Sequence, residues 1–188
     1  MKVEIITKEQ IQKLSDDALE AWLKLNRERL IGSAVFTKQD TLSSKLVRWG
    51  EKHLFAKCKT NDCFVPSHTG SIINCSGTLN IFDMKPPRAS IQPLFDYLKY
   101  TDEDYVIVLR DFPLNTEMFS FNLRFHVGES YPYLSALRSV FTKRQSKWRR
   151  HCSEMHLREL QKQDLFKDVN PEITPDELYH LLKGDMRN

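Results

Sequence analysis

HTGSIINCSGTLNIFDM, residues 68–84, decides the predicted fold of this chain. Two runs rich in β-branched residues, 68–75 and 78–84, flank Ser76-Gly77, a dipeptide typical of tight turns. The stretch therefore predicts an antiparallel hairpin. The outer ends of its two strands lie side by side, so the carboxylate of Asp83 can reach the imidazole of His68.

Further strands and helices are predicted on both sides of this hairpin. SAVFT (33–37) is a strand candidate, and DYVIVLR (104–110) is a continuous apolar run typical of a buried strand. Helices are predicted at 41–55, 91–100, 115–128, in the PYLSALRSVF segment, from Cys152 to about Gln163, and at 174–184. The pattern predicts an α+β fold, a small antiparallel sheet or barrel packed by helices.

The first 29 residues are predicted to form an N-terminal helical extension. Thr7 and Gln10 have the spacing of a capping box. One apolar stripe follows at helical spacing, made of Ile11, Leu14, Ala18, Trp22 and Leu25. The polar run 15–17 can divide this stripe between two helices, and Gly32 closes the segment. The organisation expected is an extension, 1–29, followed by one domain, 30–188.

Composition narrows the class of protein. The chain has 188 residues, 40% apolar and 28% charged, as in soluble globular proteins. A formal charge of +3 is too mild to predict a stable nucleic-acid complex. We see no signal peptide and no membrane span in the sequence, which predicts a cytoplasmic protein. The four cysteines are then expected to be thiols or ligands rather than disulfides.

RRHCSEMHLREL, residues 149–160, places Cys152 in the first turn of a predicted helix. Unpaired amides at a helix start favour a thiolate, as do cations such as Arg149 and Arg150. A nucleophilic cysteine also needs a base and a group that orients the base, which His68 and Asp83 can supply. The alternative is structural: a small core cysteine, a histidine at a strand end and a carboxylate facing solvent.

Seven segments resemble, in order, the permuted papain-like cysteine hydrolases, the YiiX-like branch of the NlpC-type peptidase superfamily. In that family the histidine precedes the cysteine in the chain. The segments are GSAVFT with LSSKLVRWG, SHTGSI, NIFDMKPP, VIVLRDFPLNTE, GESYPYLSAL, HCSEMHLREL and ITPDELYHLL. They cover about residues 30 to 184. The chain departs from the family at His151, where tyrosine is usual, and at Ser33, where aspartate is usual.

The resemblance implies that residues 30–188 are a catalytic domain with a permuted papain-like fold. It makes Cys152 the nucleophile, His68 the general base and Asp83 the orienting group of a hydrolase that cleaves an amide or ester. It places Tyr131, Tyr133 and His151 beside the substrate. The implied substrate is a small peptide, a cell-wall fragment or a lipid-like acyl compound in a bacterial or bacteriophage setting. No cofactor or metal is expected.

Two other functions are compatible with the sequence. Cys58, Cys63, His68 and Cys75 offer thiolate and imidazole ligands for a structural zinc, which would occupy His68 and exclude catalysis. KRQSKWRRH (143–151) interleaves a tryptophan with cations that can grip phosphates or single-stranded nucleic acid. The second alternative is therefore a catalytically inactive binding module that uses this basic segment.

Overall fold

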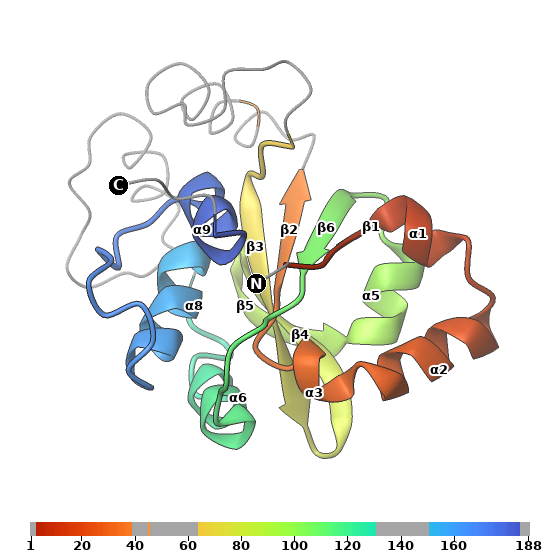
Figure 1. Ribbon diagram of the computed structural model, residues 1–188, viewed down its shortest axis with the longest axis horizontal. Helices are drawn as coiled ribbons and strands as arrows, with labels where there is room; N and C mark the ends of the chain where they lie inside the picture. Colours follow the sequence, from red (N-terminus) through yellow and green to blue (C-terminus); the bar gives the residue numbers. More distant parts are fainter. Residues whose placement is uncertain (1–2, 39–44, 46–63, 131–150, 185–188) are drawn as a thin grey trace.

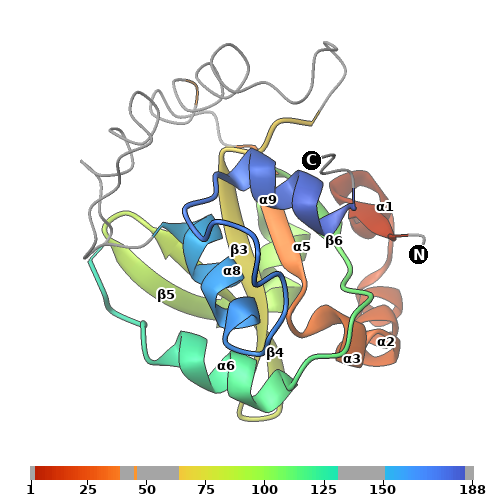
Figure 2. The same cartoon turned by 60° about the vertical axis from the view of Figure 1, so that its left-hand side comes forward.

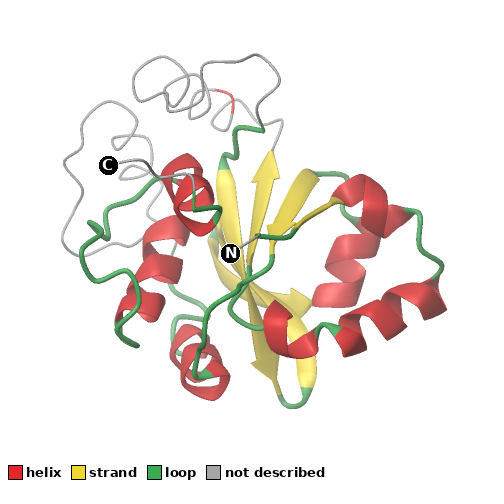
Figure 3. Ribbon diagram, viewed as in Figure 1, coloured by secondary structure: helices red, strands yellow, loops and turns green. Residues whose placement is uncertain are grey.

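The structure is a computed structural model that describes residues 3–38, 45, 64–130 and 151–184. Its centre is an open six-stranded sheet in which every pair of neighbours is antiparallel, in the order β1-β6-β2-β3-β4-β5 (Figure 3). The strands are β1 (Ile5–Thr7), β2 (Ala34–Lys38), β3 (His68–Cys75), β4 (Thr78–Lys85), β5 (Arg88–Pro93) and β6 (Asp104–Val108). Since β1 and β5 form its edges, the described sheet does not close into a barrel.

Helices cover both faces of this sheet. They are α1 (Lys8–Gln12), α2 (Asp16–Leu25), α3 (Arg27–Leu30), α5 (Leu94–Tyr100), α6 (Thr116–Arg124), α8 (Cys152–Gln161) and α9 (Pro175–Leu182). Figures 1 and 2 show α1, α2, α3 and α5 on one side, and α6, α8 and α9 on the other. The predicted α+β class is confirmed. Within the described ranges, no helix has the length and apolar character needed to cross a lipid bilayer.

The two-residue period of the strands divides the core between the two faces. Ile72 of β3 and Ile81 of β4 pack in the cluster on the α5 side. Their neighbours Ile73 and Phe82 pack in the cluster that includes α6 and α8. All four are buried. A sheet apolar on both faces has to be covered on both, which accounts for the three-layer arrangement.

The predicted hairpin of β3 and β4 is confirmed. Ile72 lies opposite Ile81, and the ladder ends at the pair Cys75 and Thr78. Ser76 and Gly77 connect the strands with φ of 50° and 84°. Positive φ at both central residues is the signature of a turn whose twist matches that of the flanking strands.

Several other local predictions are also confirmed. Strands occur at β2 and β6, and helices at α6, α8 and α9. Asn115 caps α6 through Met118 N–H, and Thr174 caps α9, where Pro175 takes the first helical position. The helices predicted at 41–55 and in PYLSALRSVF lie outside the described residues, apart from Lys45 in the first.

The N-terminal segment differs from the prediction in two respects. Ile5–Thr7 forms β1, an unpredicted edge strand that pairs with β6, so this segment adds a strand to the sheet as well as helices. The Thr7 capping box and the division at Ser15 are confirmed. The predicted apolar stripe is confirmed in part: Ile11, Leu14 and Trp22 pack in or against the core, but Leu25 is 86% exposed and Leu19 and Leu23 are buried instead. The break at Ser15 resets the helical phase, so one stripe cannot run through both helices.

The helix predicted at 91–100 begins later than expected. Residues up to Pro93 belong to β5, which pairs with β4, and α5 starts at Leu94. Pro93 ends the strand and is the N-cap residue of α5, with φ of −55°. Its side chain makes no capping hydrogen bond. Proline is tolerated here because it is the last residue of an edge strand, where the sheet needs no further backbone donor.

Arg110, just after β6, holds the turn that leads into β2. Its guanidinium donates to the backbone carbonyls of Glu28, Ile31 and Phe112. Its backbone N–H donates to Ser33 Oγ over 2.9 Å, and Ser33 Oγ in turn donates to Arg29 O over 2.6 Å. The serine at this position therefore links the start of β2 to the end of β6.

Candidate active site

Cys152 is the first residue of α8, as predicted. His151 before it is extended, with φ of −90° and ψ of 165°, and its carbonyl accepts the first helical hydrogen bond from Met155 N–H over 2.8 Å. Cys152 is 6% exposed, and hydrogen bonds from the backbone N–H groups of Thr69 and Ser153 help to lower the pKa of its thiol. These donors place partial positive charge beside the sulfur.

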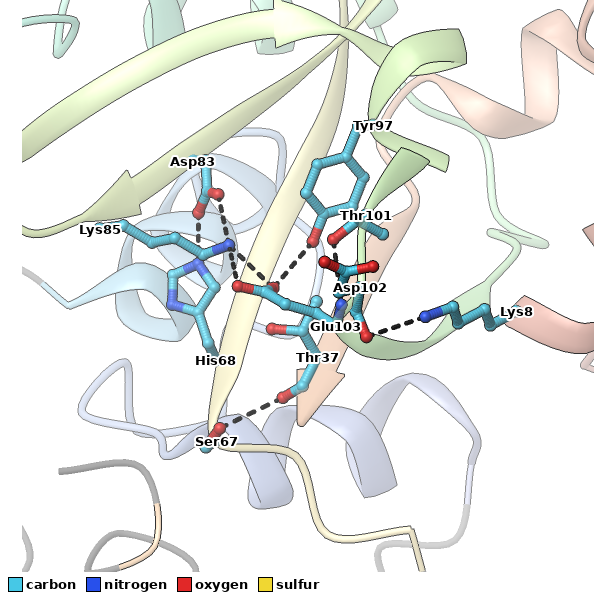
Figure 4. A network of polar contacts seen from close by, with 10 residues as sticks. All are labelled: Lys8, Thr37, Ser67, His68, Asp83, Lys85, Tyr97, Thr101, Asp102 and Glu103. Atoms are coloured by element: carbon cyan, nitrogen blue, oxygen red, sulfur yellow. Dashed lines mark hydrogen bonds and ion pairs between the residues drawn. The ribbon is translucent and has the colours of Figure 1, made fainter. Parts of the chain in front are cut away.

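His68 and Asp83 meet across the β3–β4 ladder. Asp83 lies opposite Gly70, two residues from His68, and its Oδ1 makes a short hydrogen bond with Nε2 of His68 (Figure 4). Both side chains are buried, at 6% and 4% exposure. The side chain of His68 also interacts with the thiol of Cys152, through charge and hydrogen bonding that shift the pKa of both groups. With Nε2 occupied by Asp83, Nδ1 is the ring nitrogen left for the sulfur, so the three predicted residues form one chain of contacts.

The three groups favour each other's charged forms. Burial by itself would lower the pKa of His68, but the charges of Cys152 and Asp83 raise it to about 10. Burial would raise the pKa of Cys152, but His68 and the two backbone donors hold it below its usual value. The pKa of Asp83 is likewise lowered against burial, by His68 and then by Lys85. The arrangement therefore stabilises a thiolate–imidazolium pair near neutral pH.

Lys85 completes the site on the far side of Asp83 and was not identified from the sequence. Its Nζ lies 3.0 Å from Asp83 Oδ2, and 3.1 and 2.9 Å from the two carboxylate oxygens of Glu103. The two-residue period of β4 puts Lys85 on the same face as Asp83, which is a signal the sequence does contain. Glu103 precedes β6 and has no such local relation to β4.

One polar contact joins helix α8 to the sheet, and another joins it to the segment before α9. His156, one turn after Cys152, has its Nδ1 2.8 Å from Ser71 Oγ of β3. Burial lowers the pKa of His156 to about 3, so its ring is neutral. Ser153 Oγ donates to Ile173 O over 2.5 Å. The strand that carries His68 and the helix that carries Cys152 are thus joined directly.

Gly70 is required by the close packing beside the triad. A Cβ at this position would lie 2.5 Å from Ile81 Cδ1 and 2.8 Å from Ile81 Cγ1, well inside contact distance. Ile81 is fully buried and packed in the core. Glycine in the SHTGSI segment therefore lets β3 and β4 come together where His68 meets Asp83.

The predicted substrate-side residues are only partly described. His151 is buried beside Cys152, and burial lowers its pKa to about 4, so it is neutral at neutral pH. Tyr131 and Tyr133 lie outside the described residues, as do Arg149 and Arg150. Of the basic segment 143–151, only His151 is described, so the predicted binding role of that segment stays a prediction.

The four-ligand zinc site considered from the sequence is wrong. His68 and Cys75 are the first and last residues of β3, so they lie roughly 23 Å apart at the usual rise of a strand. One zinc ion cannot bind both. Cys58 and Cys63 lie outside the described residues. The described part of the chain has no group of three or more His, Cys, Asp or Glu side chains arranged to hold a metal.

Comparison with known proteins does not identify a family. No protein-family model matches the chain, and no curated protein matches it significantly. Function is therefore inferred from the geometry and chemistry of Cys152, His68 and Asp83.

Proposed function

We propose that the protein is a cysteine hydrolase that cleaves an amide or ester bond through a Cys152–His68–Asp83 triad and a thioester intermediate. One observation carries this proposal. A cysteine at the start of a helix contacts a buried histidine whose other ring nitrogen is bonded to a buried carboxylate. A structural cysteine needs none of these partners, whereas an activated nucleophile needs all three.

The reaction follows from the charges of the pair. The Cys152 thiolate attacks the carbonyl carbon, and the resulting oxyanion collapses to a thioester as the amine or alcohol leaves with a proton from His68. Water then attacks the thioester while His68 takes its proton, and the acid leaves as Cys152 regains the thiolate. Asp83 keeps the ring oriented through both steps.

The oxyanion requires donors close to the sulfur. The backbone N–H of Cys152 is in the first turn of α8, where amides have no partner within the helix. Its position next to the nucleophile suits the oxygen of a tetrahedral intermediate. The partial positive charge of the helix start acts in the same direction.

The order of the triad in the chain supports the permuted papain-like fold as part of this proposal. His68 and Asp83 lie on neighbouring antiparallel strands, and Cys152 follows them on a helix packed against β3. This is the order that the resemblance implied. The proposed substrates are those of that resemblance: a small peptide, a cell-wall fragment or a lipid-like acyl compound, in the cytoplasm of the cell.

Trapping the acyl-enzyme tests the proposal. The chain is incubated with p-nitrophenyl acetate, quenched in acid and mapped by mass spectrometry. Acetylation is expected at Cys152, sensitive to hydroxylamine, with turnover abolished in Cys152→Ala. Cys75→Ala is the matched control, since Cys75 is also a free thiol but lies at the other end of β3. Acetylation of both cysteines to the same extent, or turnover that survives Cys152→Ala, would contradict the proposal.

A further inference from the structure

Asp83 is held by a second polar network that extends away from the triad. Its Oδ1 faces His68, and its Oδ2 faces the ammonium of Lys85 (Figure 4). Lys85 also contacts both carboxylate oxygens of Glu103, within 3.1 Å. Tyr97 of α5 donates to Glu103 over 3.4 Å, and its ring centroid lies 5.5 Å from the lysine nitrogen. The network joins β4, α5 and the loop before β6.

The charges in this network require the lysine. Asp83 and Glu103 both contact the same nitrogen, so their carboxylates lie within about 6 Å of each other, close enough to disfavour double ionisation. Asp83 is almost fully buried and the Lys85 side chain is 24% exposed, so solvent screens this pair poorly. The other titratable groups that face the Asp83–Lys85 pair are His68 and Tyr97, and Cys152 is linked to the pair only through His68.

We propose that Lys85, anchored by Glu103, is a positioning residue of the triad that keeps Asp83 ionised and its Oδ1 directed at His68. This inference rests on the proposed function, because it assigns a role in the same site. Lys85 pairs with the carboxylates of Asp83 and Glu103 rather than with the sulfur or the imidazole, so it acts on the triad through Asp83. With Lys85 and Glu103, the polar network at the site has five residues, of which the last two position the triad.

The role of Lys85 predicts a specific change in pH dependence. Without its cation, two carboxylates face each other and Asp83 takes up a proton at a higher pH than in the wild type. The imidazolium of His68 then loses its counter-charge on the acid side, and the thiolate of Cys152 becomes harder to form there. The acid limb of Cys152 reactivity should therefore move to higher pH.

The test is the pH profile of Cys152 alkylation by iodoacetamide, read by mass spectrometry in the full chain. In Lys85→Met the midpoint of the acid limb is expected to shift to higher pH by about one unit. The double variant Lys85→Met/Glu103→Gln should return it close to the wild-type position, since removing the second carboxylate relieves the repulsion. Lys85→Gln, which keeps hydrogen-bonding capacity but not the charge, should show the same shift and guards against poor folding of the methionine variant.

Lys99→Met is the matched control. Lys99 is also a partly buried, ion-paired lysine, bonded to Asp16 and Leu14 O, but it has no contact with the triad. It should lower stability without moving the acid limb. The role of Lys85 would be overturned if the acid limb of Cys152 alkylation stayed in place in Lys85→Met and Lys85→Gln. It would also be overturned if adding Glu103→Gln failed to reverse the shift. If the Lys85 variants leave the acid limb in place but Asp83→Asn moves it, the triad stands and only the role of Lys85 fails. If wild-type Cys152 shows no thiolate at acid or neutral pH, the proposed function itself fails.

Discussion

The contact between Ser71 and His156 allows a sharp prediction, because it joins the strand of His68 to the helix of Cys152. Among the described residues, Ser71 Oγ is the hydrogen-bond partner of Nδ1 of the His156 ring. Within the described residues Nε2 has none, and the ring is fully buried against Phe119. Ser71→Ala would therefore leave a buried imidazole with both nitrogens unsatisfied.

The cost can be worked from these contacts. Leaving a buried polar group without its partner costs about 1–3 kcal/mol of unfolding free energy. For a chain of this size that lowers the Tm by about 2–4 °C per kcal/mol. Replacing both partners by apolar side chains, as in Ser71→Ala/His156→Leu, avoids the unsatisfied groups and should recover most of the loss.

The depressed pKa of His156 adds a dependence on pH with a definite sign. Its folded-state pKa of about 3 is below the unfolded value of 6.5, so the unfolded chain binds the extra proton between these limits. Stability from this group is complete above about pH 6.5 and is lost as the pH falls towards 3, by about 2 kcal/mol at pH 5. The double variant lacks this histidine and should lose correspondingly less on acidification.

Urea unfolding of the wild type, Ser71→Ala and the double variant, at about pH 7.5 and about pH 5, measures both effects. The single variant should be the least stable at neutral pH, and the double variant should have the smallest loss on acidification. His151, whose pKa is also depressed by burial, is present in all three chains and cancels in the comparison. The reasoning would be refuted if Ser71→Ala were as stable as the wild type. It would also be refuted if acidification destabilised the double variant as much as the wild type.

Two further substitutions test the packing around the site. Gly70→Ala should cost about 1–3 kcal/mol, because its Cβ would overlap Ile81, and an unchanged Tm would contradict this. Arg110→Lys should cost about 2 kcal/mol, because one ammonium cannot reach the three carbonyls that the guanidinium now joins. Urea unfolding that leaves Arg110→Lys within about 0.5 kcal/mol of the wild type would show that these bonds contribute little.

The parts of the fold that were predictable have their information close together in the sequence. The Ser76-Gly77 turn fixes the register of β3 and β4, and that register alone places Asp83 near His68. The caps at Thr7 and Thr174 act over three residues. The position of Cys152 at a helix start was readable for the same reason.

The parts that were missed depend on distant contacts. β1 has three residues and is a strand because it pairs with β6, about a hundred residues later. The local pattern predicts a helix from residue 91, but residues 91–93 complete β5, because pairing with β4 outweighs that pattern. Lys85 could be placed beside Asp83 from the strand period, but its anchor Glu103 comes from a loop whose position only the folded chain defines.

The most direct test of the central claim is the pH dependence of Cys152 alkylation by iodoacetamide in the wild type and in His68→Ala. Cys75, a free and partly exposed thiol at the far end of β3, is the internal reference in the same sample. We expect Cys152 to react with an apparent pKa well below the ~8.5 of a free thiol, and to lose that reactivity in His68→Ala. If Cys152 reacts no differently from Cys75, or is unchanged when His68 is removed, there is no thiolate–imidazolium pair and the catalytic account is wrong.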